Sequence, residues 1–159
     1  MLAPWEIAPV LEEISGHGAR LAEALGHINV RPWIDRGASE TYLEQWQSAT
    51  EQARALSTTA GALARNPEKL SAGLEVLFRI QALETMLGSL EQGMRKYQTP
   101  ADAAALAALA AQNGGSRLRL ERYLVNLAAE QEQELQVMDS EAQRCRALVT
   151  APSRPSAKK

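Results

Sequence analysis

The chain has 159 residues, a mass of 17.3 kDa, a formal net charge of −2 and a pI near 5.8. This length allows one ordinary domain, and the near-neutral charge gives no reason to expect binding to nucleic acid or to an acidic membrane surface. Strong helix formers dominate, Val and Ile are few, and the longest apolar stretches, such as residues 103–111, are too short to span a bilayer. The composition therefore predicts an all-α protein without a transmembrane segment.

The first predicted helix covers residues 4–25. Its apolar residues recur at three- and four-residue steps, which places them on one helical face. Pro4 suits a first turn, whereas Pro9 is tolerated only if the helix begins late. Gly16 and Gly18 each weaken a helix by about 1 kcal/mol relative to Ala, so this helix is expected to be the least stable one.

Two long helices are expected after a connector over residues 27–38. A helix capped by Ser39 runs up to Asn66-Pro67 and carries an apolar heptad stripe. Asparagine caps helices and proline suits the first helical position, so this dipeptide is expected to begin the next helix, over residues 67–98.

The next segment is short and rich in alanine. Thr99-Pro100 repeats the cap-then-proline signal and predicts a helix over residues 100–112. The two glycines of Asn113-Gly114-Gly115 then predict a helix stop. A continuous helix through this point is the alternative, because the apolar spacing nearly persists across it.

The last predicted helix covers residues 116–149, with Ser116 as its cap. Its inner stripe is expected to consist of Leu120, Leu124, Leu127, Gln131, Leu135, Met138, Ala142, Cys145 and Val149. Ser, Pro and Lys dominate the end of the chain, so residues 151–159 are expected to form a disordered basic tail.

These elements predict one domain over residues 1–150, an antiparallel up-down bundle of four main helices plus one short connecting helix. Short connections favour antiparallel neighbours with coiled-coil-like packing. The short helix over residues 100–112 is expected to cross or cap one end of the bundle before the last helix descends.

Several segments of the chain resemble uncharacterised bacterial all-helical proteins of acidobacterial type. These segments are residues 33–42, 66–79, 96–98 and 141–146. The resemblance covers most of the chain from about residue 30 and implies no activity or ligand. Because such proteins often carry an export signal, the resemblance favours the periplasm. The first residues show no signal segment, so a periplasmic or secreted location is expected if a signal has been trimmed, and a cytoplasmic one if Met1 is the native start.

The sequence presents no recognisable catalytic, cofactor or metal-binding motif. His17 and His27 each follow a glutamate by four residues, but the two pairs lie about 15 Å apart along a helix and cannot share one ion. Exposed ion pairs explain them better. Cys145, on the expected inner stripe, is interpreted as a small core residue. We therefore expect a protein that is not an enzyme and binds no metal or cofactor.

One candidate site remains, where the up-down topology is expected to gather arginines and aromatic rings at one end of the bundle. Its residues are Arg31, Trp33, Arg36, Arg95, Lys96, Tyr97, Arg117 and Arg119. Arginine beside aromatic rings suits anions and partner side chains. The alternative is that the aromatic rings close the end of the core while the lysine and arginine side chains pair with nearby carboxylates. As a binding surface, the site requires Trp33 to be partly exposed.

The sequence therefore favours a helical scaffold that binds a protein partner or itself. A small-molecule or anion sensor is the alternative function, and a sizeable cavity beside the basic end would favour it.

Overall fold

The computed structural model describes residues 2–152 and contains six α-helices and no strand within that range. The helices are α1 (Pro4–Gly26), α2 (Arg31–Asp35), α3 (Thr41–Arg65), α4 (Leu70–Tyr97), α5 (Pro100–Ala111) and α6 (Gly114–Thr150). The all-α prediction is confirmed. Among these residues, no helix combines the length and apolarity needed to cross a membrane.

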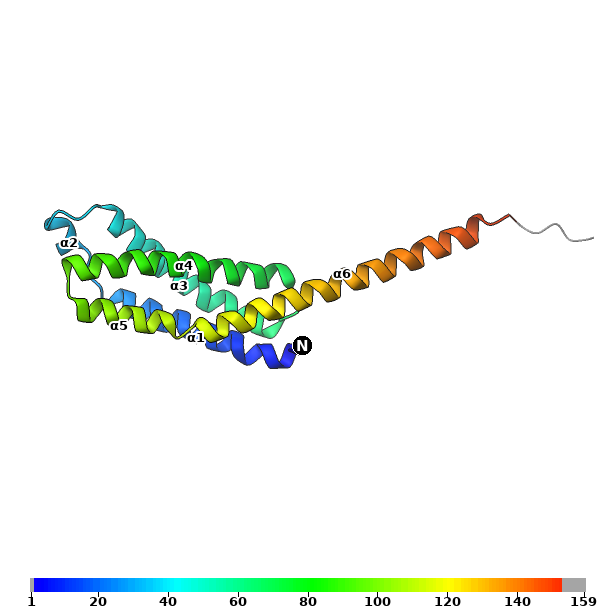
Figure 1. Ribbon diagram of the computed structural model, residues 1–159, viewed down its shortest axis with the longest axis horizontal. Coiled ribbons are helices and arrows are strands. Elements are labelled where there is room, and N and C mark those ends of the chain that lie inside the picture. The colour runs from blue at the N-terminus through cyan, green and yellow to red at the C-terminus, as the bar shows by residue number, and fades with distance from the viewer. Residues whose placement is uncertain (1, 153–159) are drawn as a thin grey trace, which may run out of the picture.

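Helices α1, α3 and α4 lie side by side along the bundle, and α5 and α6 together form its fourth side (Figure 1). Helix α5 packs along α4, and α6 continues from it to pack against α1 and α4. The expectation that the short helix crosses or caps one end is therefore wrong. This helix is half of the fourth side, so α6 starts near the middle of the bundle and projects beyond it (Figure 1).

The break between α5 and α6 lies at Gln112 and Asn113. Both residues keep right-handed backbone angles, with φ of −59° and −85°. Gly114 and Gly115 open the first turn of α6 instead of ending α5, and Ser116 is not the cap. The predicted break is confirmed, but the glycines do not act as its stop signal.

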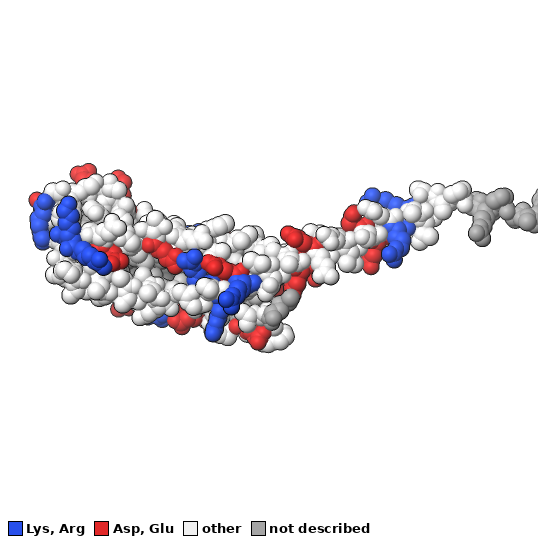
Figure 2. All heavy atoms as spheres, in the orientation of Figure 1, with Lys and Arg blue, Asp and Glu red and all other residues white. Residues whose placement is uncertain are grey.

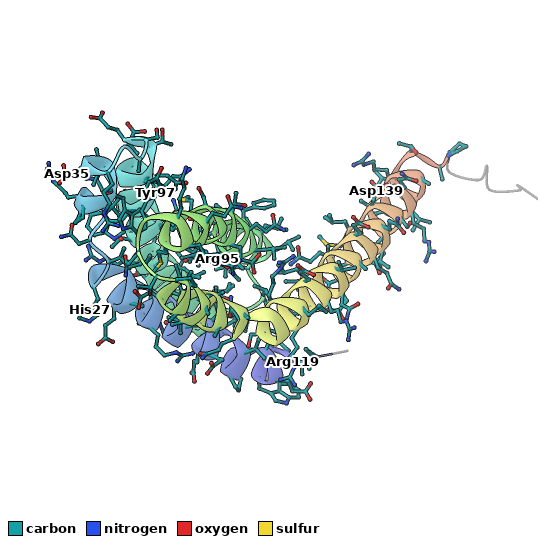
Figure 3. All side chains as sticks on the ribbon, turned by 60° about the vertical axis from the view of Figure 1, so that its left-hand side comes forward. His27, Asp35, Arg95, Tyr97, Arg119 and Asp139 are labelled. Carbon is teal, nitrogen blue, oxygen red and sulfur yellow. The ribbon has the colours of Figure 1, made fainter. Side chains whose placement is uncertain are left out.

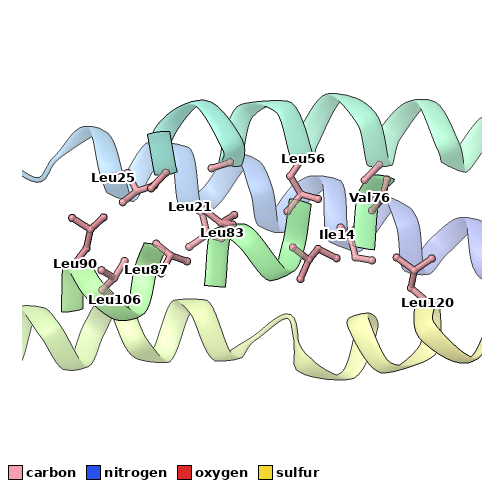
Figure 4. Close-up of a cluster of buried hydrophobic side chains, with 14 of the residues drawn as sticks. Ile14, Leu21, Leu25, Leu56, Val76, Leu83, Leu87, Leu90, Leu106 and Leu120 are labelled. Atoms are coloured by element: carbon pink, nitrogen blue, oxygen red, sulfur yellow. The ribbon is translucent and has the colours of Figure 1, made fainter. Parts of the chain in front are cut away.

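Leucine and alanine fill the core, which α1, α3, α4, α5 and α6 share (Figure 4). Helices α1 and α3 approach each other closely at Gly18. A Cβ atom added there would lie 2.8 Å from the Ala53 carbonyl oxygen and 2.9 Å from the Ser57 nitrogen. Gly18 is thus where the two backbones approach, a role that its low helix propensity does not indicate.

Local signals set several helix ends. The Thr99 side chain accepts a hydrogen bond from the Asp102 backbone at 3.1 Å, as expected for a cap. Ser39 Oγ accepts a hydrogen bond from the Thr41 backbone at 3.3 Å, although α3 begins only at Thr41. Pro67 does not begin a helix, since α4 starts only at Leu70. The predicted start of the first helix at Pro4 is confirmed, and α1 accommodates Pro9 in its interior without the late start that this proline was expected to require.

The bundle ends before helix α6 does. Every residue from 132 to 152 is exposed, whereas α6 buries residues such as Leu120 and Leu127 nearer its start. The inner-stripe prediction is therefore correct at the start of α6 and wrong from Leu135 onward. The predicted tail over residues 151–159 falls mostly on residues 153–159, which lie outside the described residues.

Candidate functional site

The predicted basic-aromatic end exists in part, but its central residue is buried. Trp33, on α2, is 1% exposed and its ring meets that of Tyr42 edge-on, with centroids 5.8 Å apart. Lys and Arg side chains gather on the surface at this end (Figure 2), where Arg95 pairs with Glu91 at 2.6 Å. Trp33 thus closes the end of the core, and the condition for a binding surface centred on it is not met.

Two of the predicted site residues do not reach this end. Arg117 and Arg119 open α6, which starts near the middle of the bundle, and Figure 3 places Arg119 well away from Tyr97. Arg117 instead contacts Glu84 of α4 at 2.7 Å and Glu121 at 2.8 Å. Because α5 occupies the first half of the fourth side, the expected gathering of all eight residues is wrong.

A groove of about 290 Å³ lies near the basic-aromatic end, between α1, α4 and α5. Its polar lining comes from His27, Gln98 and Asp102, and its lining includes no lysine or arginine. A small-molecule pocket usually encloses about 300–1,000 Å³, so this groove lies at the lower end of that range. Its lining offers an anion no guanidinium or ammonium group.

His17 is buried, which contradicts its interpretation as an exposed ion pair. It is 2% exposed, and Glu13 pairs with Arg20 at 3.0 Å instead. His17 Nε2 lies 2.7 Å from the Leu109 carbonyl oxygen of α5, so this nitrogen carries the proton and donates. Burial lowers the pKa of the His17 imidazole. The histidine thus holds α1 to α5 in its neutral form.

A second polar group lies beside this histidine at the break between α5 and α6. Asn113 Oδ1 and His17 Nδ1 are both buried without a hydrogen-bond partner among the described residues. Both residues line a cavity of about 10 Å³, roughly the smallest space that holds one water molecule. No signal in the sequence links these two positions, which α5 and α6 bring together.

The described residues contain no cluster of three or more His, Cys, Asp or Glu side chains suited to a metal ion. Cys145, expected in the core, is exposed on the far part of α6.

The far part of α6 is the most unusual surface of the molecule. We call residues 132–150 the projecting segment, and they span about 28 Å at 1.5 Å per residue. Leu135 and Met138 are each 64% exposed there, and Val149 is 86% exposed. An exposed apolar face on a regular helix is typical of a surface that another helix covers.

The apolar residues of the projecting segment form one stripe. The stripe consists of Leu135, Met138, Ala142, Cys145 and Val149, at steps of three and four residues. We call it the projecting stripe. Val137 and Leu148, also exposed, lie off its centre. This is the spacing of one side of a coiled coil.

Charged side chains lie along the whole segment. Glu132 and Glu134 lie near the bundle, together with Glu130 just before the segment, whereas Arg144 and Arg146 follow Asp139 and Glu141 toward the free end. Figure 2 shows acidic side chains nearer the bundle and a mixture of acidic and basic ones farther out. Among the described residues, none of these charges takes part in an ion pair, so the segment offers an apolar stripe between exposed, unpaired charges.

In comparisons with protein-family models, with curated proteins and with solved structures, no match was found for this chain.

Proposed function

We propose that the chain is a non-enzymatic protein-interaction module whose compact bundle displays the projecting segment of α6 to a helical partner. The observation that carries this proposal is the projecting stripe, which continues a helix of the bundle but is exposed along its whole length. A helix that presents apolar residues at heptad spacing is suited to bind another helix or an apolar groove.

The free energy expected from burying the projecting stripe supports the binding of a partner. Fully burying a Leu, Met or Val side chain contributes roughly 1.5–3 kcal/mol. Leu135, Met138 and Val149 together would contribute about 5–9 kcal/mol before the entropic cost of association is subtracted. This contribution is of the same order as the cost of association, about 4–15 kcal/mol, so the stripe suits a weak and reversible complex.

The positions of the reactive side chains support a role other than catalysis. Cys145 is exposed on the projecting segment, whereas His17 is buried against Leu109 inside the bundle. A histidine activates a cysteine only within hydrogen-bond reach, and these two residues lie on different parts of the molecule. His27, directly after α1, also lies on a different part of the molecule from Cys145.

Site-specific photocrosslinking tests the proposal. A photoreactive phenylalanine analogue at position 138 lies on the projecting stripe, and the same residue at position 137 lies on the side of the helix away from its centre. We expect light-dependent protein adducts at position 138 and far fewer at position 137 in cells of the source organism. Equal labelling at both positions, or none, would contradict a partner on this stripe.

A further inference from the structure

We infer that the projecting stripe binds the same stripe of a second copy of this chain, with the two helices antiparallel. The inference rests on the proposed function and names the occupant of that surface. It follows from the direction in which the stripe faces and from the sizes of its side chains, and the charges of the segment allow it.

The stripe continues the face by which α6 packs on its own bundle. Leu120, Leu124 and Leu127 are buried on that face, and the spacing from Leu127 to Val149 keeps the stripe within a sector of about 80°. Helices α1 and α4 therefore already occupy the space directly before the stripe. A parallel second copy would have to place its own bundle in that space. An antiparallel copy approaches from the free end, so the geometry selects it.

The side chains of the stripe fit one antiparallel register. When the two helices cross at Ser140, Leu135 of each copy faces Cys145 of the other, and Met138 faces Ala142. Each large side chain then meets a small one, which lets facing layers interdigitate. This register also overlaps residues 132–148, nearly the whole projecting segment.

The charges allow this direction but do not select it. In the antiparallel register, Glu132 of each copy lies beside Arg146 of the other, so two ion pairs form across the interface. A parallel arrangement would bring Glu141 of each copy beside Arg146 of the other, but it would also bring Glu134 beside Asp139. The position of the bundle, not the charges, therefore selects the antiparallel direction.

Two like-charge contacts in the proposed pair are unfavourable, and one of them gives a sharp test. Asp139 and Glu141 flank the crossing point, and each faces the same residue of the second copy. An exposed like-charge pair costs far less than the burial of leucine and methionine contributes, so it weakens the dimer without preventing it. Replacing this aspartate by lysine on one copy only would turn the repulsion into an attraction.

Disulfide trapping tests the direction and register. In this register Cys145 of one copy faces Leu135 of the other. The two Cys145 residues are therefore separated by ten positions, about 15 Å along the helix axis, which is too far for a disulfide. The wild-type chain should therefore stay uncrosslinked under mild oxidation. The double variant Leu135→Cys/Cys145→Ser should also stay uncrosslinked alone, but an equimolar mixture with the wild type should give a covalent dimer. Crosslinking of the wild type through Cys145 would indicate a parallel pair and overturn the inference. A mixture that stays uncrosslinked would overturn it too.

Sedimentation equilibrium of the purified full-length chain tests the association itself. We expect a reversible dimer that Met138→Asp weakens at least tenfold and that its matched control Val137→Asp leaves within twofold. Mixing Asp139→Lys with the wild type should tighten the heterodimer relative to the wild-type homodimer. Circular dichroism checks that each variant keeps its folded bundle.

The failures of the two proposals are distinguishable. A wild-type chain that stays monomeric at high concentration overturns self-pairing. If position 138 then crosslinks specifically to another protein in cells of the source organism, the proposed function stands with a different partner. If position 138 crosslinks to nothing, both proposals fall.

Discussion

The contact between α1 and α3 at Gly18 can be tested by adding one methyl group. In Gly18→Ala the new Cβ atom would lie 2.8 Å from the Ala53 carbonyl oxygen and 2.9 Å from the Ser57 nitrogen. Both neighbours are backbone atoms of α3, so neither yields without separating the helices. Overpacking of this kind lowers the stability of the fold by about 1–3 kcal/mol. The higher helix propensity of alanine raises it by about 0.8–1.0 kcal/mol. We expect a net loss of stability of up to about 2 kcal/mol.

Gly16→Ala is the matched control, because it makes the same chemical change two residues earlier in the same helix. Its new Cβ atom would meet only Arg20 Nη1, at 3.4 Å, the end of a flexible side chain. No overpacking opposes the gain in helix propensity at this position, so the variant should be more stable than the wild type by up to about 1 kcal/mol. For a chain of this size 1 kcal/mol corresponds to about 2–4 °C, so thermal melting followed by circular dichroism should show shifts of opposite sign. Two shifts of the same sign would refute the close approach of α1 and α3.

The remaining predictions concern the core and the buried histidine. Trp33→Ala should lower the free energy of unfolding by about 3–5 kcal/mol in urea titrations, and a loss below 1 kcal/mol would contradict its burial. Leu127→Ala should cost about 2–5 kcal/mol by leaving a cavity, whereas Glu132→Ala, on the exposed projecting segment, should be nearly neutral; equal melting shifts would contradict the end of the bundle. Burial lowers the pKa of folded His17 below 6.5, so the unfolded chain binds a proton more tightly and stability falls as the pH drops through about 6.5. The His17→Gln variant should lose less stability than the wild type between pH 7.5 and 5.5, and an unchanged pH dependence of the urea midpoint would count against this role.

The helices could be predicted from the sequence because their signals are local. Thr99-Pro100 begins α5 as expected, since a cap and a proline act on the adjacent turn. The arrangement of α5 depends on contacts far along the chain, and no local signal shows that it lies beside α4. The same reason explains the error at His17 and why the close approach of α3 at Gly18 could not be predicted. Glycine is a poor helix former, but its missing side chain becomes an advantage only once α3 lies against it.

The candidate site could be predicted only as a pattern. Periodicity correctly placed Leu135 and Met138 on the same stripe as Leu127. It identifies which face of a helix is apolar, but it does not show whether another element of the chain covers that face. The expected basic-aromatic site failed for the converse reason. Trp33 has the chemistry of a binding residue, but neighbouring elements such as α3 and α4 enclose it.

The continuity of α6 from the bundle into the projecting segment changes the energetics of that segment. An isolated peptide must first form a helical turn, and a nucleation constant near 10⁻³ corresponds to about 4 kcal/mol. Here residues 114–131 are already fixed by packing, so the bundle supplies the nucleus and each further residue adds to an existing helix. Propagation is nearly neutral per residue, so amide hydrogens in the projecting segment should exchange with solvent much faster than those of Leu120. A partner that covers the segment would slow this exchange, which makes the segment's own amides a direct gauge of occupancy.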